Sequence, residues 1–465
     1  MTRTYEGIDF SGLPAGFVWG AATAAFQIEG DAEHRGDSIW DAFCREPGRI
    51  ADGSDGLVAC DHVGHVAEDV RLLGDLGVDA YRFSIGWPRV QPGGSGPLDP
   101  AGLAFYDRLV DLLLDAGVQP WATLYHWDLP LPLHEAGGWP ARETADRYAE
   151  YAVAVHAALG DRVSSWMTLN EPWCSSWAGY GSGRHAPGVS DTTQATRAMH
   201  HLLLGHGRAV RAMREQAPAD HQFGIVLNLA NVTPAPGLPP DEAERVRAAL
   251  APIDGVQNRA WLDALFEGRY PQDVLDLLAP ALQEAVHDGD LEEIAAPLDY
   301  LGVNYYFDHQ MAPAPGDAPL REYAGVRGLQ AVAVTPEVTA MNWPVTPGGF
   351  RDILVRIGAE HPSAPPLVVT ENGSAWDDDP ADPLDDPQRV GYLLRHAQAL
   401  TDAVRDGADV RGYFAWSLMD NFEWARGYTK RFGLTRVDYE TLERQPRRSY
   451  GVYRDLMAAQ RAGTP

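Results

Sequence analysis

Short stretches rich in β-branched and aromatic residues recur along the chain, each followed by a longer stretch of different pattern. We expect eight strands, at 17–23, 79–85, 119–125, 164–170, 223–229, 299–305, 366–371 and 411–417. The segments between them, such as 67–78, 104–118 and 145–161, carry apolar residues at helical spacing and end near a glycine. This repeated alternation of strand and helix predicts a parallel sheet closed into a (β/α)8 barrel.

An open, doubly wound sheet is the main competing fold. Such a sheet usually carries a glycine-rich phosphate turn after its first strand. Here the first strand leads into AATAAFQIEG, which contains neither a GxGxxG nor a Walker motif. No low-complexity linker divides the sequence, so we expect residues 1–465 to form one barrel domain.

Several expected connections are long and rich in Gly, Pro and Asp. They cover residues 91–100, 179–188, 310–348 and 374–386. In a barrel of this class the loops that follow the strands build the active site. Long loops there favour a deep pocket.

The charge and the apolar pattern exclude several partners. The formal net charge is -28, which repels nucleic-acid backbones and anionic lipids. No apolar run reaches 18 residues, so we expect no membrane span. Three widely spaced cysteines and the lack of a signal-peptide pattern favour a reducing, cytoplasmic location.

Polar and aromatic residues gather where the expected strands end. They are Gln27, Arg82, His126, Trp127, Asn170, Glu171, Asn304, Tyr306, Glu371, Trp416, Glu423 and Trp424. Polar residues at any one strand end can reflect simple exposure to water. As a set, however, carboxylates, amides, an imidazole and indoles suit a polyhydroxylated ring, and the carboxyl ends of barrel strands meet at one mouth. We therefore expect a sugar site.

A metal site elsewhere is a weaker possibility. The segment DHVGHVAED places His62, His65, Glu68 and Asp69 close together. It precedes the second strand and should lie at the opposite end of the barrel from the mouth. We expect a structural role there, and neither a metal nor a cofactor.

Two glutamates follow apolar strands in the same way. Glu371 lies in LVVTENGSAW and Glu171 lies in WMTLNEPW. A pair of carboxyl groups is what glycosidic cleavage requires: one gives a proton to the leaving oxygen, and the other attacks the anomeric carbon or activates water. Arg82, projecting from the second strand, could keep Glu371 charged, so that Glu171 holds the proton. The distance between the carboxyl groups, which separates retention from inversion, does not follow from the sequence.

The motifs also resemble those of a known family. TLNEPW (168–173) and VTENG (369–373) are similar to the two signature motifs of glycoside hydrolase family 1. FVWGAATAAFQIEG, YRFSIGWPR, TLYHWDLP, NYY, GYFAWSLMDNFEW and GYTKRFGL agree in the same order. The resemblance extends from about residue 14 to 455, and it implies a retaining β-glycosidase on one barrel.

The resemblance assigns a role to each matching residue. It implies that Glu171 is the general acid/base and that Glu371 is the nucleophile. Positions that hold the nonreducing sugar in the family correspond to Gln27, His126, Asn170, Glu423 and Trp424. Asn304 and Tyr306 match residues near the nucleophile, with the tyrosine donating to it. Trp416 matches the platform under the sugar, and the aglycone side is expected at Trp173 and Trp343.

The leading interpretation is a β-glucosidase with β-galactosidase and β-fucosidase side activity, acting on small glycosides or cellobiose-like oligosaccharides. A transglycosylating enzyme is one alternative, and a non-catalytic sugar-binding protein is another. In the family that the motifs resemble, phosphosugar-specific members carry phosphate-binding residues in place of the Glu-Trp pair. This chain keeps Glu423 and Trp424, so we expect negligible activity on 6-phosphoglycosides.

Overall fold

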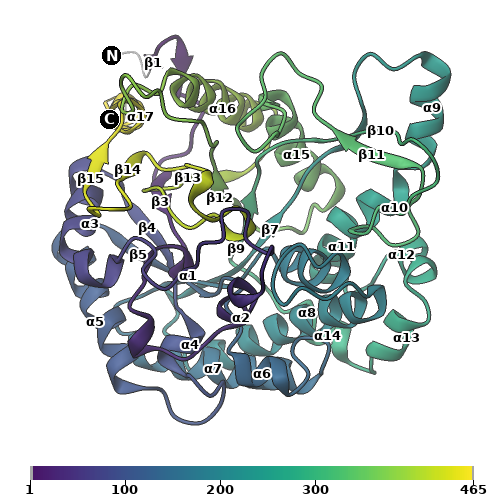
Figure 1. Cartoon of the computed structure of the whole chain (residues 1–465), viewed down its shortest axis with the longest axis horizontal. Coiled ribbons are helices and arrows are strands. Elements are labelled where there is room, and N and C mark those ends of the chain that lie inside the picture. The colour runs from purple at the N-terminus through teal and green to yellow at the C-terminus, as the bar shows by residue number, and fades with distance from the viewer. Residues whose placement is uncertain (1–3, 463–465) are drawn as a thin grey trace.

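The centre of the computed structural model, which describes residues 4–462, is a closed barrel of eight parallel strands (Figure 1). Around the barrel the order is β12-β13-β3-β4-β5-β6-β7-β9. The strands are β3 (Val18–Ala22), β4 (Ala80–Ser84), β5 (Gln119–Tyr125), β6 (Ser165–Asn170), β7 (Gln222–Asn228), β9 (Tyr300–Asn304), β12 (Leu367–Asn372) and β13 (Val410–Trp416). Each lies within one residue of its expected bounds, and the predicted (β/α)8 class is confirmed.

The barrel interior is packed with side chains, as the nearly continuous apolar strands predict. Trp121 contacts Tyr300 and Phe414 there, with ring centroids 5.4 and 5.1 Å apart. A Cβ at Gly20 would come within 2.2 Å of the Phe414 ring, so only glycine fits beside that ring. Arg82 is the exception to the apolar interior, because it is fully buried within β4.

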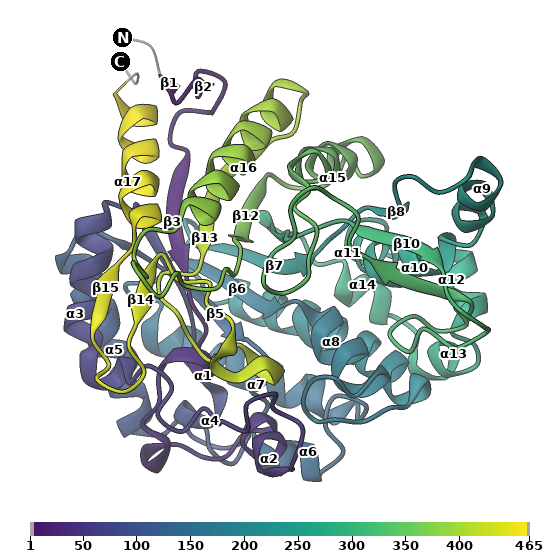
Figure 2. The same ribbon diagram turned by 45° about the horizontal axis from the view of Figure 1, so that its top comes forward.

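Long amphipathic helices surround the strands (Figures 1 and 2). They are α3 (His62–Leu76), α5 (Pro100–Asp115), α7 (Glu143–Leu159), α8 (Thr192–Arg214), α15 (Pro347–Glu360), α16 (Pro387–Arg405) and α17 (Arg448–Arg461). The first three begin before the residues expected from apolar spacing. In α5 the cause is a cap: the Asp99 carboxylate accepts from the N–H groups of Ala101 and Gly102, and Pro100 occupies the first helical position.

Short elements fill the connections. They are α1 (Ala25–Ile28), η1 (Ala32–His34), α2 (Ile39–Arg45), α4 (Trp87–Val90), α6 (Leu131–Glu135), η2 (Cys174–Gly181), α9 (Pro240–Ala248), α10 (Ala251–Asp254), η3 (Gly255–Arg259), α11 (Ala260–Glu267), α12 (Gln272–Leu277), α13 (Ala281–Ala285), α14 (Asp290–Ile294) and η4 (Trp424–Thr429). Two small hairpins join β1 (Thr4–Tyr5) to β2 (Ile8–Asp9) and β14 (Thr435–Val437) to β15 (Arg444–Pro446).

A small three-stranded sheet stands beside the barrel. It consists of β8 (Val232–Pro234), β10 (His309–Pro313) and β11 (Leu329–Val332), in the order β11-β10-β8. Figure 2 shows it next to α9 and α10, on the side of the barrel away from α3 and α5. The stretch 310–348, which we expected to be a connection, therefore contains β11 and all of β10 except its first residue, His309.

The last segment of the chain packs against the first half of the barrel. The Tyr453 hydroxyl on α17 donates to the carbonyl of Gly20 in β3, at 2.7 Å. Arg444 in β15 forms a fully buried ion pair with Asp69 on α3, at 2.8 Å. Asp69 also contacts His62, at 2.8 Å, so this acidic segment forms a packed structural cluster on α3.

Candidate active site

A cavity of about 620 Å³ opens at the carboxyl ends of the barrel strands. The following residues expected at a sugar site line it: His126, Trp127, Glu171, Trp173, Asn304, Tyr306, Trp343, Glu371, Trp416, Glu423 and Trp424. Gln27, Arg82 and Asn170 are not among its lining residues. They are buried behind the lining, and each contacts a residue that forms it: Gln27 contacts Glu423, Arg82 contacts Glu371 and Asn170 contacts His126. The structure thus brings the whole predicted set together.

Glu371 is held by two donors near the end of β12. Arg82 Nη1 donates to Glu371 Oε1 at 2.6 Å, and the Tyr306 hydroxyl donates to Oε2 at 2.6 Å. Burial raises the pKa of Glu371, while the positive charge of Arg82 and the Tyr306 hydrogen bond oppose that rise. These two neighbours favour the ionised carboxylate.

Glu171 has a different environment, immediately after β6. Asn304 Nδ2 donates to Glu171 Oε1 at 2.7 Å, and the Cys174 thiol donates to Oε2 at 3.1 Å. Burial, and then the negative charge of Glu371, raise the pKa of Glu171 to about 7. Its backbone φ is +44°, in the left-handed region that a side chain disfavours.

A chain of hydrogen bonds fixes the imidazole of His126. Asn170 Oδ1 accepts from Arg82 Nη2 at 2.7 Å and from Asn304 Nδ2 at 3.0 Å. The Asn170 amide nitrogen therefore faces His126 Nε2, at 2.9 Å, and donates to it. Burial and the charge of Arg82 lower the pKa of His126 well below its ordinary value. The neutral ring thus carries its proton on Nδ1, which has no partner within residues 4–462.

Gln27 is oriented in a similar way by the loop after β13. Its Nε2 donates to Asn421 Oδ1 at 2.8 Å and to the carbonyl of Phe422 at 2.9 Å. Its Oε1 has no partner in the described part of the chain and remains an acceptor. Beside it, burial and the charges of Glu371 and Glu171 raise the pKa of Glu423 to about 8. Glu423 therefore holds its proton more tightly than an isolated glutamate.

Aromatic rings form the walls of the cavity. At the inner end, Trp416 lies parallel to the His126 ring at 5.8 Å, and Trp424 contacts Trp127 at 4.5 Å. Farther out, Trp343 stacks on Phe307 at 4.9 Å. These walls offer apolar faces to a ring-shaped ligand.

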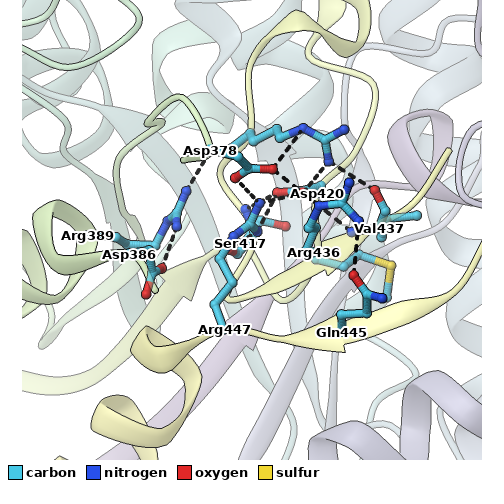
Figure 3. Close-up of polar contacts among 12 residues, drawn as sticks. Asp378, Asp386, Arg389, Ser417, Asp420, Arg436, Val437, Gln445 and Arg447 are labelled. Atoms are coloured by element: carbon cyan, nitrogen blue, oxygen red, sulfur yellow. Dashed lines mark hydrogen bonds and ion pairs between the residues drawn. The ribbon is translucent and has the colours of Figure 1, made fainter. Parts of the chain in front are cut away.

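The loop 417–424, which carries Glu423 and Trp424, rests on a buried ion network (Figure 3). Asp420 is fully buried and accepts from Arg447 at 2.9 and 3.0 Å and from Arg431 at 2.7 Å. It also accepts from the N–H of Gly433 at 2.9 Å. Asp378 joins the network through Arg447, at 2.7 Å. These bonds fix the loop from beneath.

Sequence reasoning missed Cys174, Asn421 and Asp420. Cys174 follows Glu171 by three residues, a spacing that one turn of helix brings together. That spacing was the available signal. Asn421 and Asp420 lie in a motif that we singled out only for Glu423 and Trp424. Their partners come from distant segments, so no local pattern indicates them.

Two further features of the described residues bear on ligands. Among residues 4–462, no group of three or more His, Cys, Asp or Glu side chains is placed to hold a metal ion. Over the same residues, no helix combines the length and the apolar character needed to cross a bilayer.

Two buried glutamates with unlike neighbours, facing one cavity at the strand ends of a (β/α)8 barrel, provide the acid and the nucleophile that cleavage of a glycoside needs, so the fold and the site define a glycoside-cleaving enzyme. The model of the family described as glycosyl hydrolase family 1 matches residues 10–462, and the chain belongs to that family.

Characterised relatives are similar over nearly the whole chain. A thermostable β-glucosidase B from Thermobispora bispora is 48% identical over 448 residues, which are 96% of this chain and 90% of the relative. A bifunctional β-D-glucosidase/β-D-fucosidase from Bifidobacterium breve is 44% identical, over 96% of this chain and 98% of the relative. Among solved structures, a psychrophilic β-glucosidase from Micrococcus antarcticus has a TM-score of 0.89 and 45% identity, covering 97% of this chain and 98% of its own.

Proposed function

We propose that this chain is a retaining β-glucosidase that removes terminal, non-reducing β-D-glucosyl residues from small glycosides and cellobiose-like oligosaccharides. The observation that carries the proposal is the unequal environment of two glutamates in one cavity. Glu371 is held by Arg82 and Tyr306, whereas the pKa of Glu171 is raised to about 7. One carboxylate is thereby prepared to attack and the other to donate a proton.

In the first step, a carboxylate oxygen of Glu371 attacks the anomeric carbon, and the bond from that carbon to the aglycone oxygen breaks. Glu171 transfers its proton to the departing oxygen, so the aglycone leaves as a neutral alcohol. The product is a glycosyl ester of Glu371. Tyr306 loses its charged acceptor when the ester forms.

In the second step, a water molecule attacks the same carbon and the ester bond breaks. Esterification has removed the negative charge of Glu371, which contributed to the high pKa of Glu171. The pKa of Glu171 therefore falls, and its carboxylate accepts the proton of the water. Glucose leaves with its original configuration, because two inversions at carbon one cancel.

The sugar is oriented by groups whose hydrogen-bonding direction is already fixed. Within residues 4–462, His126 Nδ1–H at the cavity wall has no acceptor, and Gln27 Oε1, directly behind the wall, has no donor. Glu423, whose pKa is raised to about 8, can donate when its carboxyl group is protonated and accept in either form. Trp416 supplies a flat apolar face for the pyranose ring.

Side activity on β-fucosides and β-galactosides belongs to the same proposal. The relative from Bifidobacterium breve is named as both a β-D-glucosidase and a β-D-fucosidase, which supports it. Hydrolysis is favoured over a purely sugar-binding role, because both glutamates are present. Transfer of the glucosyl group to a second sugar depends on the outer loops. For the location we retain the cytoplasm, on the three free cysteines.

Azide rescue tests the roles of the two glutamates. In Glu371→Ala, azide should replace the nucleophile and give the α-glucosyl azide from an activated β-glucoside. In Glu171→Ala, azide should intercept the glycosyl-enzyme and give the β-glucosyl azide. NMR distinguishes the two products, and Glu322→Gln at the cavity rim serves as a matched control. The same azide anomer from both glutamate variants contradicts the proposal.

A 6-phosphate tests the inner end of the cavity. Glu423 lines this end, and the nearby cation Arg82 is buried behind the lining and already paired with Glu371 at 2.6 Å, so it is not available to a phosphate dianion. Burying a charged group without a partner costs several kcal/mol, so we expect at least about a hundredfold loss of kcat/KM on nitrophenyl 6-phospho-β-glucoside. Comparable rates on the plain and phosphorylated sugars would show that the inner end binds anions.

A further inference from the structure

Three arginines whose side chains are at least partly exposed line the cavity and form what we call its rim, although the chain as a whole is strongly acidic. The formal net charge is -28, with 37 Lys and Arg against 65 Asp and Glu. Arg49, Arg184 and Arg426 nevertheless all line the cavity. They come from three separate segments, after α2, after η2 and within η4. Their convergence is therefore a property of the fold rather than of one basic stretch.

The three guanidinium groups differ in how far they are neutralised. Arg184 pairs with Glu322 at 2.9 Å, and Arg49 pairs with Glu46 at 2.7 Å. Arg426 is exposed, and its side chain has no hydrogen-bond or ion-pair partner within residues 4–462. A charged side chain of this kind at a cavity mouth is available to a ligand.

Arg426 and Arg184 act on the same part of the cavity. Besides burial, the positive charges of Arg184 and Arg426 lower the pKa of His185, which also lines the cavity. His185 in turn contacts Trp127, with ring centroids 5.2 Å apart. The arginines of the rim therefore lie close to the inner end of the cavity, where Trp127 is located.

The inner end does not cancel this positive rim at neutral pH. The charge of Glu371 is balanced by Arg82, at 2.6 Å. Burial and neighbouring carboxylates raise the pKa of Glu171 to about 7 and that of Glu423 to about 8. A negatively charged group on the aglycone therefore interacts mainly with the positive charges of the three arginines.

The walls between the inner end and the rim suit a flat ring. Trp173 lies 5.8 Å from Tyr323, and Trp343 stacks on Phe307 at 4.9 Å. Met311, Met341 and Leu320 complete this apolar lining. Such walls offer flat apolar faces on which an aromatic aglycone can stack.

We propose that the outer cavity selects β-glucosides whose aglycone is an aromatic ring bearing a carboxylate, and that Arg426, assisted by Arg49 and Arg184, recognises that carboxylate. The inference rests on the proposed β-glucosidase function and names its substrate class. The substrates are the β-glucosides of phenolic acids. The aromatic ring fills the slot between the walls, and the carboxylate reaches the rim.

The test compares matched pairs of substrates. The acids are the 4-O-β-glucosides of 4-hydroxybenzoate and 4-hydroxycinnamate, which place the carboxylate at two distances from the glycosidic oxygen. In each control a CH₂OH group replaces the carboxylate. We expect kcat/KM for at least one acid to exceed its alcohol by about threefold or more at low ionic strength, and 0.5 M NaCl to reduce the ratio.

Variants of the rim test whether its arginines cause the preference for the acid over the alcohol. Arg426→Ala should lower the acid-to-alcohol ratio by about threefold, as expected for an exposed charge pair, and Arg426→Lys should retain most of it. The control is Arg71→Ala, which removes one positive charge from exposed α3, outside the cavity. Each ratio is taken within one enzyme, so differences in leaving-group reactivity cancel between variants.

The outcomes separate the two proposals. A ratio near one for both acids, or a ratio that Arg426→Ala leaves unchanged, overturns the inference while hydrolysis of the alcohols preserves the β-glucosidase assignment. Failure to hydrolyse any of the four glucosides overturns the function itself. A ratio that falls equally in Arg71→Ala assigns the effect to overall charge and overturns the role of the rim.

Discussion

At the scale of residues, two glutamates in one cavity differ in proton affinity because their neighbours differ. Glu371 faces a guanidinium and a phenol, and Glu171 faces an amide and a thiol. The cation beside Glu371 opposes the effect of burial, and Glu171 has only weaker donors. A difference in proton affinity follows directly from this arrangement.

The hydrogen bond from Cys174 should shift the alkaline limit of activity, because it lowers the pKa of Glu171. Its thiol donates to Glu171 Oε2, and this bond favours the ionised carboxylate. Burial raises the pKa of Cys174 well above its ordinary value, so the thiol stays protonated as a donor. In Cys174→Ala the pKa of Glu171 should therefore rise, and the alkaline limb of kcat/KM should move to higher pH by about half a unit or more.

The measurement is a pH–rate profile with a nitrophenyl β-glucoside. Cys174→Ser restores a hydroxyl donor and is the matched control. A profile of Cys174→Ala that lies on the wild-type curve contradicts the role of the thiol.

Glu171 should also make stability depend on pH. Its pKa is about 7 in the folded chain, against about 4.3 for an unperturbed glutamate, so the folded state binds the proton more tightly. This stabilisation is present below the unfolded pKa and is lost as the pH rises towards 7. Glu171→Gln has no carboxyl group to ionise, so it does not lose this stabilisation as the pH rises. We expect the free energy of unfolding of the variant to exceed that of the wild type by about 2 kcal/mol more at pH 8 than at pH 5.5.

Urea unfolding at both values of pH provides the check. Glu322→Gln, which removes a carboxylate paired with Arg184 at the rim, is the control with which the gain is compared. Equal gains for Glu171→Gln at the two values contradict the shifted pKa.

At the scale of elements, the loop 417–424 joins the sugar site to a buried ion network. Asp420→Asn keeps the shape of the side chain but leaves Arg447 and Arg431 without its charge. Breaking a buried pair in this way costs about 3–5 kcal/mol of stability. Because Glu423 and Trp424 lie on the same loop, we also expect KM to rise for β-glucosides.

Thermal unfolding and steady-state kinetics test this expectation together. Asp385→Asn is the matched control, because its pair with Arg448 is half exposed and should contribute less than about 1 kcal/mol. If Asp420→Asn unfolds with the wild-type midpoint and retains the wild-type KM, the network does not support the loop.

The elements also show what the sequence can predict. The eight barrel strands were predictable because each is a short apolar run with turn-forming residues around it. The strands β10 and β11 were not, because Gly, Pro and Asp surround them and because β8 (Val232–Pro234), the parallel partner of β10, is distant in the sequence. The residues of the candidate site were found from strand ends and motifs. Cys174 and Asp420 were missed because their importance depends on contacts formed only in the folded chain.

At the scale of the whole molecule, the barrel is closed by contacts between its first and last parts. Arg444 and Asp69 are both fully buried, and they connect β15 to α3. Arg444→Ala leaves the carboxylate of Asp69 buried without its main partner, so we expect a loss of about 3–5 kcal/mol in the free energy of unfolding.

Urea unfolding measures this loss. Arg454→Ala on the exposed face of α17 is the control and should change stability by less than about 1 kcal/mol. The double variant Arg444→Met/Asp69→Leu should recover much of the stability, because it removes both buried charges. A loss in Arg444→Ala no larger than in Arg454→Ala would show that closure does not depend on this pair.

The left-handed backbone at the cavity has an evolutionary consequence. Glu171, Trp127 and Trp424 have φ values of +44°, +78° and +49°, which side chains adopt at a cost of about 1–3 kcal/mol each. A library of variants selected only for heat resistance should therefore enrich glycine or asparagine at these three positions. Such a selection would stabilise the fold but remove the proposed acid/base, Glu171, and two of the rings that line the cavity.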